Sequence, residues 1–204
     1  MSDRPRSGVV LAGGYSTRFE GADKALATVE GRPMLARVVG RLAGVVDHLV
    51  VSCRADQEPA FAAALDGVTD TPIAFVPDPE PDGGPLAGLA ASLAAVETPF
   101  AAVVACDMPF LDPDFVAYLF ERAAGHDAAI PELDDGHLQP TQAVYRADRL
   151  AAVADRLLAA DRRSLYGALD ELDTVVIPAS TVAAHTDWRS LRDVNSRADL
   201  DDLR

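Results

Sequence analysis

The chain has 204 residues, with 18 basic against 32 acidic side chains and a formal net charge of −14. A domain of this length buries enough apolar surface to fold without disulfides, and Cys53 and Cys106 are too few for a secreted disulfide scaffold. A surface this acidic repels nucleic acid and anionic membranes, which argues against both as partners. The sequence shows neither a signal peptide nor a membrane span, so we expect a cytoplasmic protein.

The choice of charged residues is biased as well. Lys24 is the only lysine, and aspartate outnumbers glutamate by 24 to 8. This bias is typical of proteins kept soluble at high salt, where charge repulsion is screened. A GC-rich genome is an alternative explanation of the scarcity of lysine, because it replaces lysine codons with arginine codons. Both explanations would be true of a halophile.

Apolar strand-like segments alternate with helix-like segments along the chain. In order, the pattern predicts strand Gly8–Leu11, helix Pro33–Ala43, strand His48–Ser52, helix Glu58–Leu65, strand Ile73–Val76, helix Leu86–Val96, strand Phe100–Cys106, helix Pro113–Ala124 capped by Asp112, strands Ala128–Pro131 and Thr141–Tyr145, helices Asp148–Ala160 and Leu165–Leu172, strand Thr174–Pro178 and a last helix capped by Ser196. Phe100–Cys106 is a continuous apolar run, which places it at the centre of a sheet. Asp134–Gly136 favours a hairpin-like excursion.

This alternation predicts an α/β fold. We expect one three-layer α/β/α domain over residues 1–204, with a mostly parallel, Rossmann-like sheet. Ligands of such sheets bind at the carboxyl ends of the strands. The loops that follow the strands are therefore the places to look for chemistry.

The first such loop is suited to a polyphosphate. Gly13 and Gly14 let the backbone turn sharply after the first strand. Hydroxyl donors and two cations follow at Ser16, Thr17, Arg18 and Lys24. The loop has neither the Walker A ending nor the dinucleotide glycine pattern. A plain tight turn is the alternative, but the position of the only lysine favours a phosphate site.

Four segments lie at or after the ends of predicted strands or near the C-terminal end of the chain. They are Leu-Ala-Gly-Gly-x-Ser-x-Arg-x-x-Gly-x-Asp-Lys-Ala-Leu at 11–26, Gly-Pro-Leu-Ala-Gly at 84–88, Cys-Asp-Met-Pro-Phe at 106–110 and Asp-Val-Asn-Ser-Arg-Ala-Asp-Leu at 193–200. Together they resemble the molybdenum cofactor guanylyltransferases. The match covers nearly the whole chain in the family's order. It departs from the family at Asp193, where asparagine is usual. Residues 137–145 resemble the family's acceptor-side motif Gln/His-Pro-Leu-x-Ala-x-Tyr, with Thr141 where leucine is usual.

The resemblance implies a nucleotide-diphospho-sugar transferase-like fold that transfers GMP from GTP to molybdopterin with Mg²⁺ and releases pyrophosphate. Residues 1–110 would bind the nucleotide and residues 111–204 the acceptor. The implied catalytic residues are Arg18, Lys24 and Asp107, with Asp107 also as metal ligand. The implied nucleotide-binding residues are Leu11, Ala12, Gly13, Gly14, Ser16, Thr17, Arg18, Lys24, Asp78, Gly83, Gly84, Pro85 and Gly88, and the implied acceptor-binding residues are Gln139, Pro140, Asp193 and Asn195.

Several alternatives stay open at this point. Asp107 could cap the turn before Pro109, and Asn195 could cap a helix entry. Asp193 could join Asp107 on a metal or simply reflect the acidic composition. Sister activities on the same fold are a cytidylyltransferase on molybdopterin and a guanylyltransferase on adenosylcobinamide phosphate, and a non-catalytic nucleotide-binding regulator is a third reading. Transient contact with other molybdenum cofactor enzymes is expected only from the resemblance.

Overall fold

A computed structural model describes residues 4–14, 23–79, 84–196 and 199 of the chain. Its strands are β1 (Ser7–Leu11), β2 (Thr28–Val29), β3 (Arg32–Pro33), β4 (His48–Cys53), β5 (Ile73–Pro77), β6 (Phe100–Ala105), β7 (Ala128–Pro131), β8 (Gln142–Arg146) and β9 (Thr174–Ile177). Its helices are α1 (Met34–Leu42), α2 (Glu58–Leu65), α3 (Pro85–Leu93), α4 (Pro113–Arg122), α5 (Ala147–Ala159), α6 (Leu165–Leu169) and α7 (Ala179–His185), with the 3-10 turns η1 (Lys24–Leu26) and η2 (Trp188–Leu191).

Seven strands form one sheet in the order β5-β4-β1-β6-β8-β7-β9. The pairs β5–β4, β4–β1, β1–β6 and β7–β9 are parallel, whereas β8 is antiparallel to both of its neighbours. The predicted mostly parallel sheet is thus confirmed, and β6 occupies its centre as expected from its unbroken apolar sequence. The excursion from β7 to β8 is the predicted hairpin-like one, with a bridge between Glu132 and Leu138.

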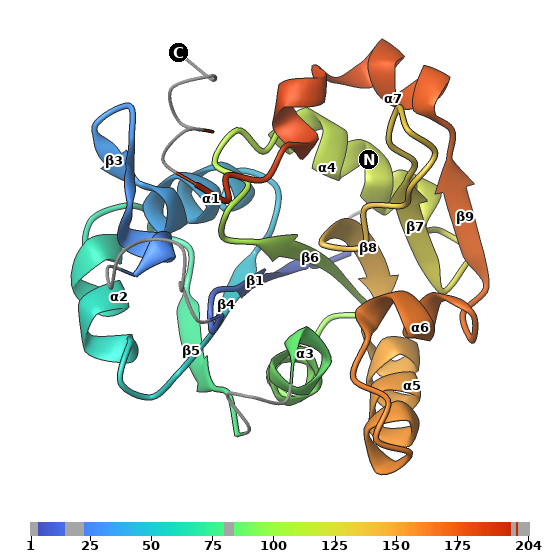
Figure 1. Cartoon of the computed structure of the whole chain (residues 1–204), viewed down its shortest axis with the longest axis horizontal. Coiled ribbons are helices and arrows are strands. Elements are labelled where there is room, and N and C mark those ends of the chain that lie inside the picture. Colours follow the sequence, from blue (N-terminus) through green and yellow to red (C-terminus); the bar gives the residue numbers. More distant parts are fainter. Residues whose placement is uncertain (1–3, 15–22, 80–83, 197–198, 200–204) are drawn as a thin grey trace.

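Helices cover both faces of this sheet, which makes the predicted three layers (Figure 1). Side chains of a strand point alternately to the two faces, so Val9 packs among residues of α3 and α5 while Val10 packs among those of α1 and α4. Val9 and Val10 are both fully buried. Apolar burial on both faces is the main stabilising contribution, at about 25 cal/mol per Å² of buried apolar surface.

The helices follow from their apolar spacing and their caps. Leu35, Val38, Val39 and Leu42 recur at helical spacing and are completely buried on one side of α1. The Asp112 side chain accepts a hydrogen bond from the Asp114 amide, as predicted for the start of α4. Among the described residues, no helix combines the length and the apolar character needed to cross a membrane.

Some predicted boundaries and elements differ from the structure. The expected helices to Val96 and Leu172 end at Leu93 and Leu169, because the following residues close into tighter turns such as Val96 N–H to Leu93 O and Leu172 N–H to Leu169 O. The hairpin β2–β3, the helix α7 and both 3-10 turns were not predicted. The hairpin strands and the 3-10 turns have two to four residues, too few to show a periodic apolar pattern, and the seven-residue α7 buries only Val182.

Candidate functional site

A cavity of about 440 Å³ opens at the carboxyl edge of the sheet, where β1, β4, β5 and β6 end. This volume lies within the range of small-ligand pockets. The lining residues are Leu11, Gly13, Gly14, Ser52, Asp78, Gly84, Pro85, Gly88, Ala105 and Thr141. The cavity therefore lies where ligand binding was predicted, at the carboxyl ends of the strands.

Most of the predicted nucleotide-binding residues lie in this lining. The residues that the sequence analysis missed are Ser52, Ala105 and Thr141, each of which lies within or directly beside the end of a strand. Ala12 is buried beneath the lining, and its amide donates to Ser52 O at 2.8 Å. The predicted residues Ser16, Thr17, Arg18 and Gly83 lie outside the described residues.

The glycine pair of the first loop does not need glycine for its backbone angles. Positive φ values occur at Gly31, Gly67, Gly84, Gly125 and Gly136, and not at Gly13 or Gly14. These two positions therefore do not require glycine for a left-handed backbone, and the rest of the predicted turn, residues 15–22, lies outside the described residues. A Cβ at Gly14 would meet nothing within 4 Å, so the missing side chain leaves open space beside the cavity. The Arg54 guanidinium holds the pair in place through 3.3 Å hydrogen bonds to both carbonyl oxygens.

Gly88 keeps the far wall of the cavity open. It lies in the first half of α3, and a Cβ there would come within 2.9 Å of Ser52 Oγ and 3.1 Å of Asp78 Oδ2. Both of these polar side chains line the cavity. A side chain at position 88 would therefore displace the polar groups that a ligand would meet.

We expect Gly88→Ala to weaken nucleotide binding without destabilising the free protein. Alanine favours a helix over glycine by about 1 kcal/mol, which offsets the cost of moving Ser52 and Asp78. Thermal unfolding with and without Mg²⁺ and GTP measures both effects. Gly40→Ala, the same exchange inside α1, is the matched control, because it lies in another helix against Val68. A nucleotide-induced shift equal to that of the unaltered chain would contradict the prediction.

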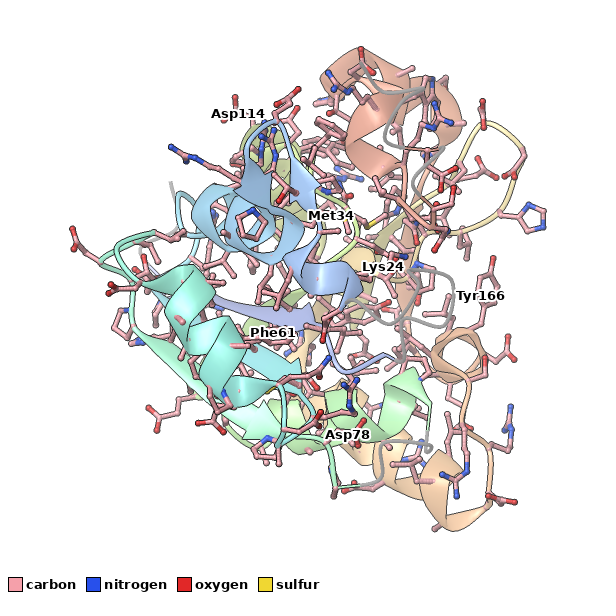
Figure 2. All side chains as sticks on the ribbon, turned by 60° about the vertical axis from the view of Figure 1, so that its left-hand side comes forward. Lys24, Met34, Phe61, Asp78, Asp114 and Tyr166 are labelled. Atoms are coloured by element: carbon pink, nitrogen blue, oxygen red, sulfur yellow. The ribbon has the colours of Figure 1, made fainter. Side chains whose placement is uncertain are left out.

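Lys24, Asp107 and Asn195 meet beside this cavity. Lys24 Nζ lies 2.7 Å from Asp107 Oδ2 and 2.6 Å from Asn195 Oδ1. Contrary to expectation, Lys24 does not lie on a loop but begins the 3-10 turn η1, which Asp23 caps by accepting from the Ala25 amide. The Lys24 and Asp107 side chains are 17% and 20% exposed, so both are largely shielded from solvent. Lys24, Asp107 and Asn195 do not line the cavity themselves, but Ala105, two residues before Asp107, does. Figure 2 shows Lys24 at η1 and Asp78 after β5, while Asp114 lies apart on α4.

The carboxylate of Asp107 does not cap the turn that follows it. One of its oxygens binds Lys24, and the other, Oδ1, is buried without a hydrogen-bond partner among the described residues. A buried carboxylate oxygen without a donor is costly unless a cation satisfies it. The Asp107 backbone carbonyl accepts from the Val194 amide at 2.8 Å, which attaches the C-terminal segment to the end of β6.

In the C-terminal segment, different side chains cap the backbone and contact Lys24. Ser196 Oγ accepts from the Asp199 amide, while the Asp199 carboxylate accepts from the amides of Asn195 and Ser196. These backbone hydrogen bonds lower the pKa of Asp199. The Asn195 side chain therefore does not cap the backbone. Its Oδ1 accepts from Lys24, and its Nδ2 donates to Asp193 Oδ2.

The predicted acceptor residues Gln139 and Pro140 organise the turn before β8. Gln139 accepts from Thr141 Oγ1 at 3.0 Å and donates to Leu191 O at 3.4 Å. The Pro140 carbonyl accepts from the phenol of Tyr145, whose pKa burial raises. Of this turn, Thr141 is the residue that lines the cavity.

Neither cysteine is suited to nucleophilic chemistry. Both thiols are free and buried. Burial and the nearby acidic charges raise the pKa of Cys53 to about 11, and burial together with the Asp107 charge raises that of Cys106 further. The thiolate, which is the reactive form, is therefore scarce at neutral pH.

Comparison with known proteins identifies the family. Residues 8–175 match the family model described as MobA-like NTP transferase domain. The chain is 48% identical over 200 residues to a protein of Natronomonas pharaonis named "probable molybdenum cofactor guanylyltransferase", covering 98% of this chain and 96% of the relative. It is 36% identical over 166 residues to the molybdenum cofactor guanylyltransferase of Burkholderia lata, covering 77% of this chain and 78% of the relative.

Solved structures agree with this assignment. Molybdopterin-guanine dinucleotide biosynthesis protein A from Archaeoglobus fulgidus superposes with a TM-score of 0.75 at 25% identity, covering 96% of this chain and 95% of the other. The 4-diphosphocytidyl-2C-methyl-D-erythritol synthase of Anaerococcus prevotii has a TM-score of 0.72 at 15% identity, with 97% and 93% coverage, and shares the fold. The chain belongs to the family of MobA-like NTP transferases.

Proposed function

We propose that this chain is a molybdenum cofactor guanylyltransferase, which transfers GMP from GTP to molybdopterin and releases pyrophosphate. The observation that carries the proposal is the meeting of Lys24, Asp107 and Asn195 beside a cavity lined by the first and second motif loops. The relatives named above, which cover most of the chain, carry the same activity in their names.

Asp78 supports guanine as the base. Its carboxylate lies on the cavity wall beside Ser52, near the glycine-lined start of α3. The guanine edge carries two adjacent N–H donors, on N1 and on the exocyclic N2, and a carboxylate can accept from both. Cytosine offers a single exocyclic amino group on that edge, so we assign preference for GTP to Asp78.

The reaction needs no nucleophile from the protein. A phosphate monoester acceptor is largely ionised at neutral pH, since its second pKa is about 6. Its oxygen attacks the α-phosphorus of GTP, the α–β bridging P–O bond breaks, and pyrophosphate leaves with the bonding electron pair. Catalysis then consists of alignment and of stabilising negative charge, for which Lys24 provides a cation at the cavity edge. Arg18 stays a predicted second cation, outside the described residues.

The residues present also fit a Mg²⁺ ion. Asp107 Oδ1 is a buried carboxylate oxygen without a hydrogen-bond partner among the described residues. Asp193 accepts from the side-chain amide of Asn195, whose oxygen contacts the same Lys24 amine as Asp107. Mg²⁺ is commonly held by one or two carboxylates together with substrate phosphates. When bound, the ion would neutralise charge on the phosphates. We propose Asp107 as its protein ligand and Asp193 as a second candidate.

The two halves of the chain supply different parts of this site. Leu11, Asp78 and Gly88, from residues 1–110, line the cavity together with Thr141, and Asn195 contacts Lys24. We propose that residues 1–110 bind the nucleotide and residues 111–204 the acceptor. We therefore propose that molybdopterin approaches from the side of Thr141, Gln139 and Asn195. We further place the enzyme in the cytoplasm, where free thiols persist, and keep transient contact with other molybdenum cofactor enzymes as a proposal.

Thermal unfolding in high KCl with Mg²⁺ and each of GTP, CTP, ATP and UTP tests the nucleotide. A ligand at about 100 times its Kd stabilises the folded state by about 2.7 kcal/mol, so we expect a clear shift of the melting temperature with GTP alone. Formation of the guanine dinucleotide from molybdopterin then tests the acceptor. A shift with CTP alone would indicate the cytidylyl activity, and GTP binding without product would indicate a regulator.

A further inference from the structure

Gln57 is a buried amide beside the first motif loop. It precedes α2, is 4% exposed, and its side chain does not cap its own helix. Its Oε1 accepts from the Arg54 amide at 2.8 Å, and its Nε2 donates to Asp23 Oδ2 at 2.5 Å and, more weakly, to Ala12 O at 3.5 Å. Ala12 and Asp23 flank the part of the first motif that contains the predicted phosphate-binding residues.

The neighbours of Gln57 require an amide. One of them, the Arg54 N–H, needs an acceptor, and the other two, the Asp23 carboxylate and the Ala12 carbonyl, need donors. A glutamine side chain offers one acceptor oxygen and two N–H donors. Glutamate of the same length would keep the acceptor, lose both donors and place a second carboxylate against Asp23. A buried polar group in such a network is costly when one partner is removed.

Asp23 transmits this constraint to Lys24. While Oδ2 of Asp23 is held by Gln57, Oδ1 accepts from the Ala25 amide and so caps the turn that begins at Lys24. Lys24 then reaches Asp107 and Asn195. We propose that Gln57 is a positioning residue for guanylyl transfer, which holds Lys24 at the phosphates through the carboxylate of Asp23. This inference rests on the proposed function for its catalytic consequence and not for its structural one.

The test is a double-mutant cycle between positions 57 and 23, assayed at pH 8. Gln57→Glu removes the donor, and Asp23→Asn places a donor against a donor, so each should lower kcat with GTP by more than about tenfold, since a displacement of about 1 Å can cost 100-fold. The combination Gln57→Glu with Asp23→Asn restores one hydrogen bond with exchanged donor and acceptor and returns the net charge to that of the unaltered chain. We expect it to recover kcat to within about threefold, because contacting residues couple non-additively.

Because Lys24 is the only lysine of the chain, its side chain can be observed alone. In protein labelled with carbon-13 at lysine Cε, the single Cε signal should shift in both single variants and return in the double variant. This measurement needs no substrate, so it tests whether Gln57 positions Lys24 through Asp23 independently of enzymatic activity. Failure of the unaltered enzyme to form the guanine dinucleotide would contradict the proposed function and not this inference. Ala60→Glu adds the same charge at an exposed position of α2 and is the matched control, expected to leave the signal unchanged.

Two results would overturn the proposal. One is a Lys24 signal in folded Gln57→Glu protein that coincides with that of the unaltered chain. The other is a double variant whose Lys24 signal and kcat stay as altered as those of the single variants, since exchange of donor and acceptor should then restore the hydrogen bond that positions Lys24. A role of Gln57 in stability alone predicts lower melting temperatures with the Lys24 signal and kcat unchanged.

Discussion

Replacing Lys24 by alanine should lower the rate of guanylyl transfer by about 10²–10³-fold, equivalent to about 2.7–4 kcal/mol, because that is the usual effect of removing one preorganised donor from developing negative charge. The amine of Lys24 is the cation that the structure places against Asp107 and Asn195 at the cavity edge. Steady-state assays with saturating GTP and Mg²⁺ measure kcat directly. The loss should appear in kcat more than in the KM for GTP.

The fold should survive this change. The Lys24 side chain belongs to no apolar core cluster, whereas its neighbour Ala25 does. Cooperative thermal unfolding and an unchanged circular dichroism spectrum are the controls. Lys24→Arg should recover only part of the activity, because a planar guanidinium does not replace a compact ammonium between a carboxylate and an amide oxygen. Normal turnover by the alanine variant would refute the phosphate role of Lys24.

Asp107→Asn should shift the Mg²⁺ dependence of the reaction to concentrations at least about tenfold higher, which corresponds to about 1.4 kcal/mol of lost metal binding. Asparagine retains one oxygen that can accept from Lys24 but removes the negative charge that Mg²⁺ prefers. The measurement is a titration of initial rate against Mg²⁺ at fixed GTP. Since Asp107 Oδ1 has no donor within the described residues, the exchange removes no hydrogen bond at that atom.

Asp112→Asn is the matched control for this titration. Asp112 belongs to the same strand-end segment, but it caps α4 and accepts from Thr186 Oγ1. Asparagine caps a helix about as well as aspartate. The control therefore removes an equal charge nearby, and we expect the dependence of the initial rate on Mg²⁺ to stay that of the unaltered chain. Identical titration curves for Asp107→Asn and the unaltered chain would remove Asp107 from the metal site.

The architecture was predictable from the sequence because local patterns determine it. Continuous apolar strands such as Phe100–Ala105 must be covered on both faces, and strand–helix alternation then leads to a parallel sheet between two helical layers. The same rule places the loops after β1, β5 and β6 at one edge of the sheet, so the order of strands and helices along the chain is enough to indicate that the motifs containing Gly13, Gly88 and Asp107 lie at that edge. The acidic, lysine-poor composition is likewise a property of the sequence and agrees with the haloarchaeal source of the Natronomonas pharaonis relative.

The contacts within the site depended on the tertiary structure. Lys24 and Asn195 are 171 residues apart, and their hydrogen bond exists because the Val194 amide binds the Asp107 carbonyl at the end of β6. Gln57 has no motif of its own, and its role follows from two atoms, Ala12 O and Asp23 Oδ2, that the fold brings to it. Backbone patterns are set by neighbours along the chain, whereas donors and acceptors find partners only when packing brings distant segments within hydrogen-bond distance. The sequence by itself therefore determined the fold and the edge that carries the chemistry, and only the tertiary structure decided which polar atoms meet there.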